Sequence, residues 1–251
     1  MDSKDAFPQP SPFLRAAPPV PWGAREVLLG VLAAGLGILA LNGGVLAINH
    51  LAHFSFRDHS NALMLFVIAQ DAILFGAAAG FSVVRSRGGW SLLGLRRFNV
   101  RLGCGLSIAL LFASYAVRAC YAFAALALGA QLQSQSIVPR LDVSGVGFAL
   151  TFFAAAIVAP IVEEIFFRGF VYAGLRARWG VAGALLLSAV FFTALHFTLD
   201  LFVPIFILGV FLAWVYEKTG SLYPGILLHA SNNAIALVTL WAIRATGVAP
   251  L

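Results

Sequence analysis

Three charged side chains interrupt an apolar stretch of the chain between Ala159 and Phe170. They are Glu163, Glu164 and Arg168. Each ionised side chain near the centre of a membrane helix costs roughly 2.5–3.5 kcal/mol on insertion scales, so a partner or a function must offset this cost. Glu164 and Arg168 are four residues apart and lie on one helix face, in the order that favours an ion pair. Glu163 is turned away by about 100°, so we expect it to remain available as a general base. The alternative is that all three charges only hold helices together.

Two histidines and an asparagine in the last third of the chain have side chains suited to the same chemistry. His196 ends the run Phe-Thr-Ala-Leu-His, and His229 precedes Asn233 by four residues, so the last two project from one helix face. A glutamate can accept a proton from water, and a histidine beside it can share that proton or position the water. Histidine and asparagine can donate hydrogen bonds to the oxyanion that forms when water attacks an amide. This set suffices for metal-free peptide hydrolysis, and the chain has no Gly-x-Ser-x-Gly elbow that would indicate a serine nucleophile.

The elements that must position these residues are membrane helices. The chain is 61% hydrophobic and only 10% charged, whereas soluble domains are about 25% charged. Apolar runs long enough to cross a bilayer lie at 26–49, 62–84, 103–130, 144–174, 180–198, 201–216 and 221–243. The sequence therefore predicts an all-α, polytopic membrane helix bundle with about seven transmembrane helices, give or take one. A re-entrant or broken helix is an alternative near Pro204.

We divide the chain into three parts. Residues 1–24 are rich in proline and are expected to form a flexible N-terminal tail. Residues 25–142 are expected to be scaffold transmembrane helices, and residues 143–251 the catalytic transmembrane core. Asp71 and Arg118 are charged residues within the scaffold helices, and we expect them to pair across the bundle.

The Lys and Arg side chains predict the orientation in the membrane, because cytosolic loops carry an excess of them. The larger group comprises Lys4, Arg15, Arg25, Arg85, Arg87, Arg96, Arg97, Arg101, Arg176, Arg178 and Lys218, against Arg57, Arg140 and Arg244 on the other side. We therefore expect a multi-pass integral membrane protein with a cytosolic N-terminus, in the inner (plasma) membrane of a bacterium. The net charge of +6 is explained by this topology, and no nucleic-acid partner is expected.

The motifs Glu163-Glu164-x-x-x-Arg168, Phe192-x-x-x-His196 and His229-x-x-x-Asn233 follow one another on apolar segments. Together they resemble the three ordered motifs of the CPBP family, the CAAX-protease and bacteriocin-processing or Abi group of intramembrane proteases. The resemblance covers roughly residues 143–243. It implies a glutamate-type protease, similar to CAAX prenyl endopeptidases, in which Glu163 activates water with help from His196. It further implies that His229 and Asn233 form the oxyanion hole, while Glu164 and Arg168 support the site.

No cofactor is expected, with zinc as the alternative. Glu163, His196 and His229 could supply three protein ligands and leave the fourth position to water, as in catalytic zinc sites. The sequence lacks His-Glu-x-x-His, the usual signature of zinc proteases.

The expected partners are the lipid bilayer and a peptide or lipidated protein substrate, whose identity the sequence does not specify. Two other functions stay open. The protein could be a non-catalytic membrane immunity or partner-binding protein of the Abi type. It could also be a proton-coupled transporter, since buried acids and histidines can form a proton relay, although the halves of the chain show no inverted repeat.

Overall fold

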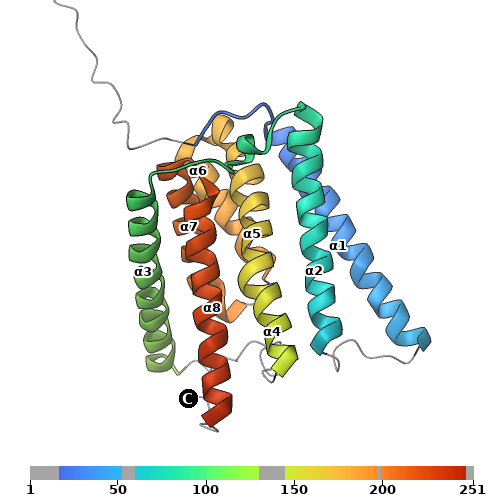
Figure 1. Cartoon of the computed structure of the whole chain (residues 1–251), viewed down its shortest axis with the longest axis vertical. Helices are drawn as coiled ribbons and strands as arrows, with labels where there is room; N and C mark the ends of the chain where they lie inside the picture. The colour runs from blue at the N-terminus through green and yellow to red at the C-terminus, as the bar shows by residue number, and fades with distance from the viewer. Residues whose placement is uncertain (1–16, 53–59, 130–144, 197–198, 247–251) are drawn as a thin grey trace, which may run out of the picture.

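The computed structural model describes residues 17–52, 60–129, 145–196 and 199–246, and these ranges are mostly helical. The α-helices are α1 (Ala24–Ala52), α2 (Ser60–Ala79), α3 (Val100–Ala127), α4 (Gly145–Phe153), α5 (Ala159–Glu164), α6 (Ala173–Ala194), α7 (Phe202–Thr219) and α8 (Leu222–Thr246). Within the described ranges, six helical stretches are long and apolar enough to cross a membrane. The predicted polytopic helix bundle is therefore confirmed (Figure 1).

The longest of these stretches, Gly145–Ala194, is broken at Gly180. Gly180 has φ 65° and ψ −176°, a backbone conformation that glycine adopts without steric cost. Beyond the break, Ser188 donates a hydrogen bond to the carbonyl of Phe167 at 2.9 Å, so the second half of α6 packs back along the first half of the stretch. The stretch therefore contains two membrane crossings. With one crossing for each of the other five stretches, the bundle has about seven crossings.

Two π-helical segments flank α5, which carries both glutamates. The first, η5, spans Ala154–Val158, and the second, η6, spans Ile165–Tyr172. Every residue of η6 is buried. A π-helix has a hydrogen bond that spans one more residue than in an α-helix, and it frequently occurs at functional sites. The wider turns therefore change which way the side chains before and after α5 point.

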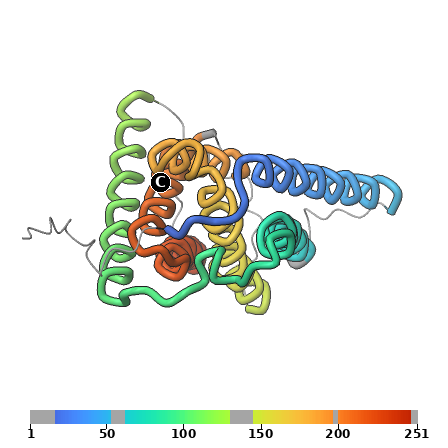
Figure 2. The backbone as a smooth tube through the Cα atoms, turned by 90° about the horizontal axis from the view of Figure 1, so that it is seen from above, coloured from blue at the N-terminus to red at the C-terminus, as the bar shows by residue number. Residues whose placement is uncertain are grey.

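The helices are arranged so that α2 and α3 lie on opposite sides of α5 and α8 (Figure 2). α2 packs against α1, α4 and α5, whereas α3 packs against α7 and α8. The expected ion pair between Asp71 of α2 and Arg118 of α3 is therefore wrong. The Arg118 guanidinium instead lies over the ring of Tyr115, 5.6 Å from its centre.

The end of the bundle that is uppermost in Figure 1 is closed by the segment before α3. Gly94 accepts a hydrogen bond from the backbone of Leu222 at 2.9 Å, and Ser221 donates to the carbonyl of Arg96 at 2.8 Å. A side chain at Gly169 would lie 2.6 Å from the carbonyl oxygen of Leu93, so this segment touches the backbone of η6 directly. The segment therefore holds η6 and the start of α8 in place.

The predicted N-terminal tail, residues 1–24, lies largely outside the described residues. Its last part packs on the bundle, because Ala17 and Trp22 are buried. The Trp22 indole donates a hydrogen bond to the carbonyl of Phe170 in η6 at 3.1 Å.

Candidate active site

Glu164 and Arg168 form the ion pair that their spacing predicts. Arg168 Nη1 lies 2.8 Å from Glu164 Oε1, and both side chains are 0% exposed. Arg168 also donates to the carbonyl of Gly209 in α7 at 3.1 Å, and its guanidinium lies 4.5 Å from the ring centre of Phe192 in α6. The arginine therefore joins η6 to α5, α6 and α7 behind the site.

His229 lies between the two glutamates. Its Nδ1 is 3.2 Å from Glu164 Oε1, and its Nε2 is 3.8 Å from Glu163 Oε2. Because a carboxylate only accepts hydrogen bonds, Nδ1 must carry the proton that is donated to Glu164. The neutral ring then presents the Nε2 lone pair toward Glu163. Glu164 is thus not only the partner of Arg168, as the sequence predicted, but also orients the imidazole.

His229 Nε2 and Glu163 Oε2 approach each other without forming a direct hydrogen bond. Their distance of 3.8 Å exceeds a direct hydrogen bond, so a hydrogen-bonded link between the two atoms needs a bridging water. Within the described residues, Glu163 Oε2 is buried and has no hydrogen-bond partner. The Glu163 side chain keeps 18% of its surface exposed, against 0% for Glu164. Glu163 therefore has the more exposed side chain of the two glutamates.

Asn233 is held by a backbone group that Pro160 leaves free. In η5 the amide of Ala159 donates to the carbonyl of Ala154, five residues earlier. The next bond of this series would reach the carbonyl of Ala155, but Pro160 has no N–H to donate. Asn233 Nδ2 donates to that carbonyl instead, at 2.8 Å. The proline and the π-helical turn thus fix the carboxamide one helical turn beyond His229.

His196 joins this group through the ring of Phe192. α6 ends at Ala194, and His196 Nδ1 donates back to the carbonyl of Phe192 at 2.8 Å. The Phe192 ring lies 4.7 Å from the His196 ring and 5.5 Å from the His229 ring, between centres. Phe192 therefore contacts both imidazole rings. The i, i+4 spacing of Phe192 and His196 in the sequence predicts the contact between their rings. It does not predict the contact between Phe192 and His229.

The arrangement does not gather a metal site among the residues that the structure describes. Within those ranges, no three His, Cys, Asp or Glu side chains are close enough to bind one metal ion together. The alternative zinc ligands Glu163, His196 and His229 are included in this statement, since all three are described. Glu163, His196 and His229 therefore do not converge on one point in this structure.

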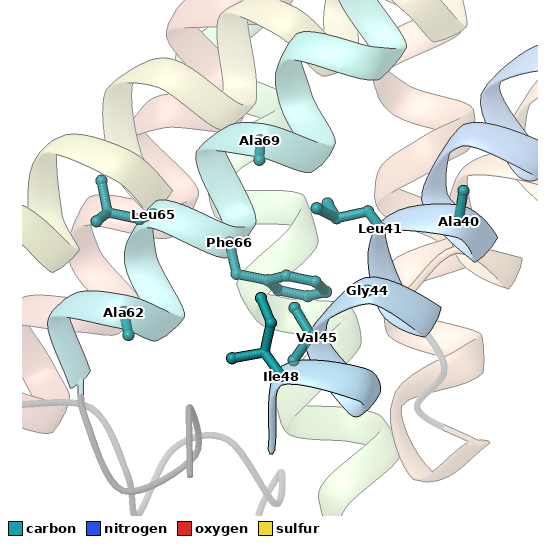
Figure 3. Close-up of a pocket in the computed structure, with 9 residues that line it drawn as sticks. All are labelled: Ala40, Leu41, Gly44, Val45, Ile48, Ala62, Leu65, Phe66 and Ala69. Carbon is teal, nitrogen blue, oxygen red and sulfur yellow. The ribbon is translucent and has the colours of Figure 1, made fainter. Parts of the chain in front are cut away.

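A separate cavity lies between α1 and α2 (Figure 3). Its volume is about 410 Å³ and its lining is apolar, with residues Ala40, Leu41, Gly44, Val45, Ile48, Ala62, Leu65, Phe66 and Ala69. None of the site residues lines it. No polar side chain lines this cavity, so it has no group that could activate water, and the candidate active site is the polar group around Glu163.

The candidate site brings a glutamate and an imidazole together inside an apolar helix bundle, and one family model matches this part of the chain. Residues 145–235 match the family model described as Rce1-like, type II CAAX prenyl endopeptidase Rce1-like. The matched region contains all three motifs, from Glu163 to Asn233. The match confirms the resemblance to CPBP-family intramembrane proteases and supports a peptidase. No curated protein and no solved structure matches the chain.

Proposed function

We propose that this protein is an intramembrane endopeptidase that hydrolyses a peptide bond of a membrane-associated or lipidated protein, with Glu163 as the general base. The observation that carries the proposal is the approach of His229 Nε2 to Glu163 Oε2, at 3.8 Å. Both atoms accept hydrogen bonds, and a water molecule has two hydrogens to donate. Such a water would keep its oxygen lone pairs free to attack a carbonyl carbon.

The reaction then needs only groups of this chain. Glu163 takes one proton from the water as the water oxygen bonds to the carbonyl carbon of the substrate. The carbonyl oxygen becomes an oxyanion, and Glu163 passes its proton to the amide nitrogen as the C–N bond breaks. The first products are a carboxylic acid and an amine, the acid then gives its proton to the amine or to solvent, and Glu163 returns to its ionised form.

Asn233 is assigned to the oxyanion. One amide hydrogen is bound by Ala155, and the second remains available to donate to the developing charge. His229 can donate from Nε2 only as an imidazolium, because its other nitrogen is committed to Glu164. We therefore assign neutral His229 to holding the water, and an oxyanion role to its protonated form.

His196 is assigned to the water side of the site together with Glu163, as the resemblance implies. Its support is the contact with Phe192, which also contacts His229. Since Nδ1 donates to the Phe192 carbonyl, the neutral ring offers Nε2 as an acceptor for a proton or a water.

The test is cleavage of a panel of quenched fluorescent peptides, some of them lipidated, by detergent-purified protein with and without a zinc chelator. We expect hydrolysis at one bond in at least one peptide, at a rate that the chelator does not change. A rate that falls on chelation and returns with zinc would replace the metal-free mechanism with the zinc alternative. If no peptide is cleaved but one binds, a partner-binding or immunity function would be favoured instead.

A further inference from the structure

Asp71 is a buried acid in a part of the chain to which the sequence assigned only a scaffold role. It lies on the stripe of α2 that faces the bundle interior, together with Met64, Leu74 and Ala78, which are 0–6% exposed. Asp71 itself is 4% exposed. This side of the bundle brings α2 against α5 and η6. An unpaired ionised aspartate in such a place is costly and indicates a function.

Asp71 lies on α2, which packs against α5, the helix that carries Glu163. Among the described residues, Asp71 Oδ2 and Glu163 Oε2 are both buried side-chain oxygens without a hydrogen-bond partner. Glu163 is also the charged group that acts electrostatically on Asp71. Two carboxylates in a buried site cannot both be ionised at low cost, and such pairs share one proton.

The other charged groups around the pair determine which acid holds the proton. Arg168 of η6 acts electrostatically on Glu163, and His229 of α8 approaches Glu163 at 3.8 Å. α4 and η5 carry no titratable side chain, and the charged residues of α1, Arg25 and Glu26, lie at its start. Glu163 thus has an arginine and a histidine nearby and 18% of its side-chain surface exposed, whereas Asp71 is 4% exposed and forms no ion pair among the described residues.

We propose that Asp71 holds the proton of this pair and donates it as a hydrogen bond to Glu163, directly or through one water. Asp71 is then a positioning residue of the proposed peptidase, on whose function this inference rests. The neutral acid fixes the orientation of the Glu163 carboxylate while leaving its charge intact, so that the free lone pairs face the water held by His229. α2 thereby contributes to the active site.

Two variants test whether Asp71 acts as a hydrogen-bond donor or only fills space. Asp71→Asn keeps a neutral donor of the same shape, whereas Asp71→Leu keeps the volume and removes the donor. We expect Asp71→Asn to retain a kcat within a few-fold of wild type, and Asp71→Leu to lose at least ~10-fold in kcat with little change in KM. An Asp71→Leu variant that is folded and as active as wild type would overturn the proposal, as would loss of activity in folded Asp71→Asn.

An infrared measurement tests the proton without any substrate. The wild-type protein at neutral pH should show the carbonyl stretch of a protonated carboxylic acid, and this band should be lost in Asp71→Asn and kept in Glu163→Gln. An unchanged spectrum in Asp71→Asn would show that Asp71 is ionised and would refute the inference. This result does not depend on cleavage, so failure of the peptidase assignment and failure of the Asp71 assignment are distinguished.

Discussion

Glu163→Gln should lower the rate of peptide cleavage by ~100-fold or more while leaving the protein folded. Glutamine has nearly the same shape as glutamate but cannot accept the proton of water, and removing a general base typically costs about 10²–10⁴-fold. The carboxamide can still occupy the space beside His229, so substrate binding should change little. The measurement is the initial rate of the same fluorescent peptide with each variant, together with KM, in the same detergent or liposomes.

Glu26→Gln is the matched control, because it makes the same chemical change at the start of α1, where Glu26 lies 3.9 Å from Arg85. This control should cleave at the wild-type rate. A folded Glu163→Gln variant that kept more than half of the wild-type rate would mean that another group activates the water.

Arg168→Met should cause the largest loss of stability of any single charge removal in the chain. The substitution leaves the Glu164 carboxylate with 0% exposure and without its cation, and breaking a buried pair in this way costs about 3–5 kcal/mol. It also removes the hydrogen bond to Gly209 and the contact with Phe192. The loss should be measured as the change in unfolding free energy in detergent.

The double variant Glu164→Gln with Arg168→Met should recover much of this stability. It leaves no unpaired charge, and the glutamine oxygen can still accept from His229 Nδ1, so its cost should be well below that of Arg168→Met alone. Arg85→Met is the control, since the Arg85 side chain is 56% exposed and exposed pairs contribute little. Wild-type stability in Arg168→Met would contradict the view that this pair anchors the site.

The positions of the helices and the Glu164–Arg168 pair could be predicted because both follow from local sequence. Apolar runs mark the spans, and i, i+4 spacing on a helix brings two side chains together whatever surrounds them. The division of the long apolar region between 174 and 180 was expected from its arginines, and the break occurs at Gly180.

The geometry within the site could not be predicted from periodicity. The π-helical turns on both sides of α5 shift the register by one residue, and no residue type marks them in advance. The hydrogen bond that Asn233 donates to the carbonyl of Ala155 depends on this shift together with Pro160. The contact between Glu164 and His229 likewise depends on how α8 packs against α5.

The sequence also did not predict which helices lie next to each other. Asp71 and Arg118 were expected to pair because they have opposite charges at intramembrane positions, but the order of helices around the bundle places α5 and α8 between them. Opposite charges on two membrane helices therefore did not suffice to predict an ion pair. Asp71 instead lies on a helix that packs against α5, which carries an acid, Glu163, and charge complementarity would not suggest that neighbour.

The most direct test of the central claim, that Glu163 acts as a base on water, is one turnover with excess protein in water enriched in heavy oxygen. If Glu163 only removes a proton, each new product carboxylate will contain one heavy oxygen atom and the protein will contain none. If Glu163 attacks the carbonyl itself, heavy oxygen will enter its own carboxylate and mass spectrometry will find it in the peptide that contains Glu163. That result would contradict the general-base mechanism.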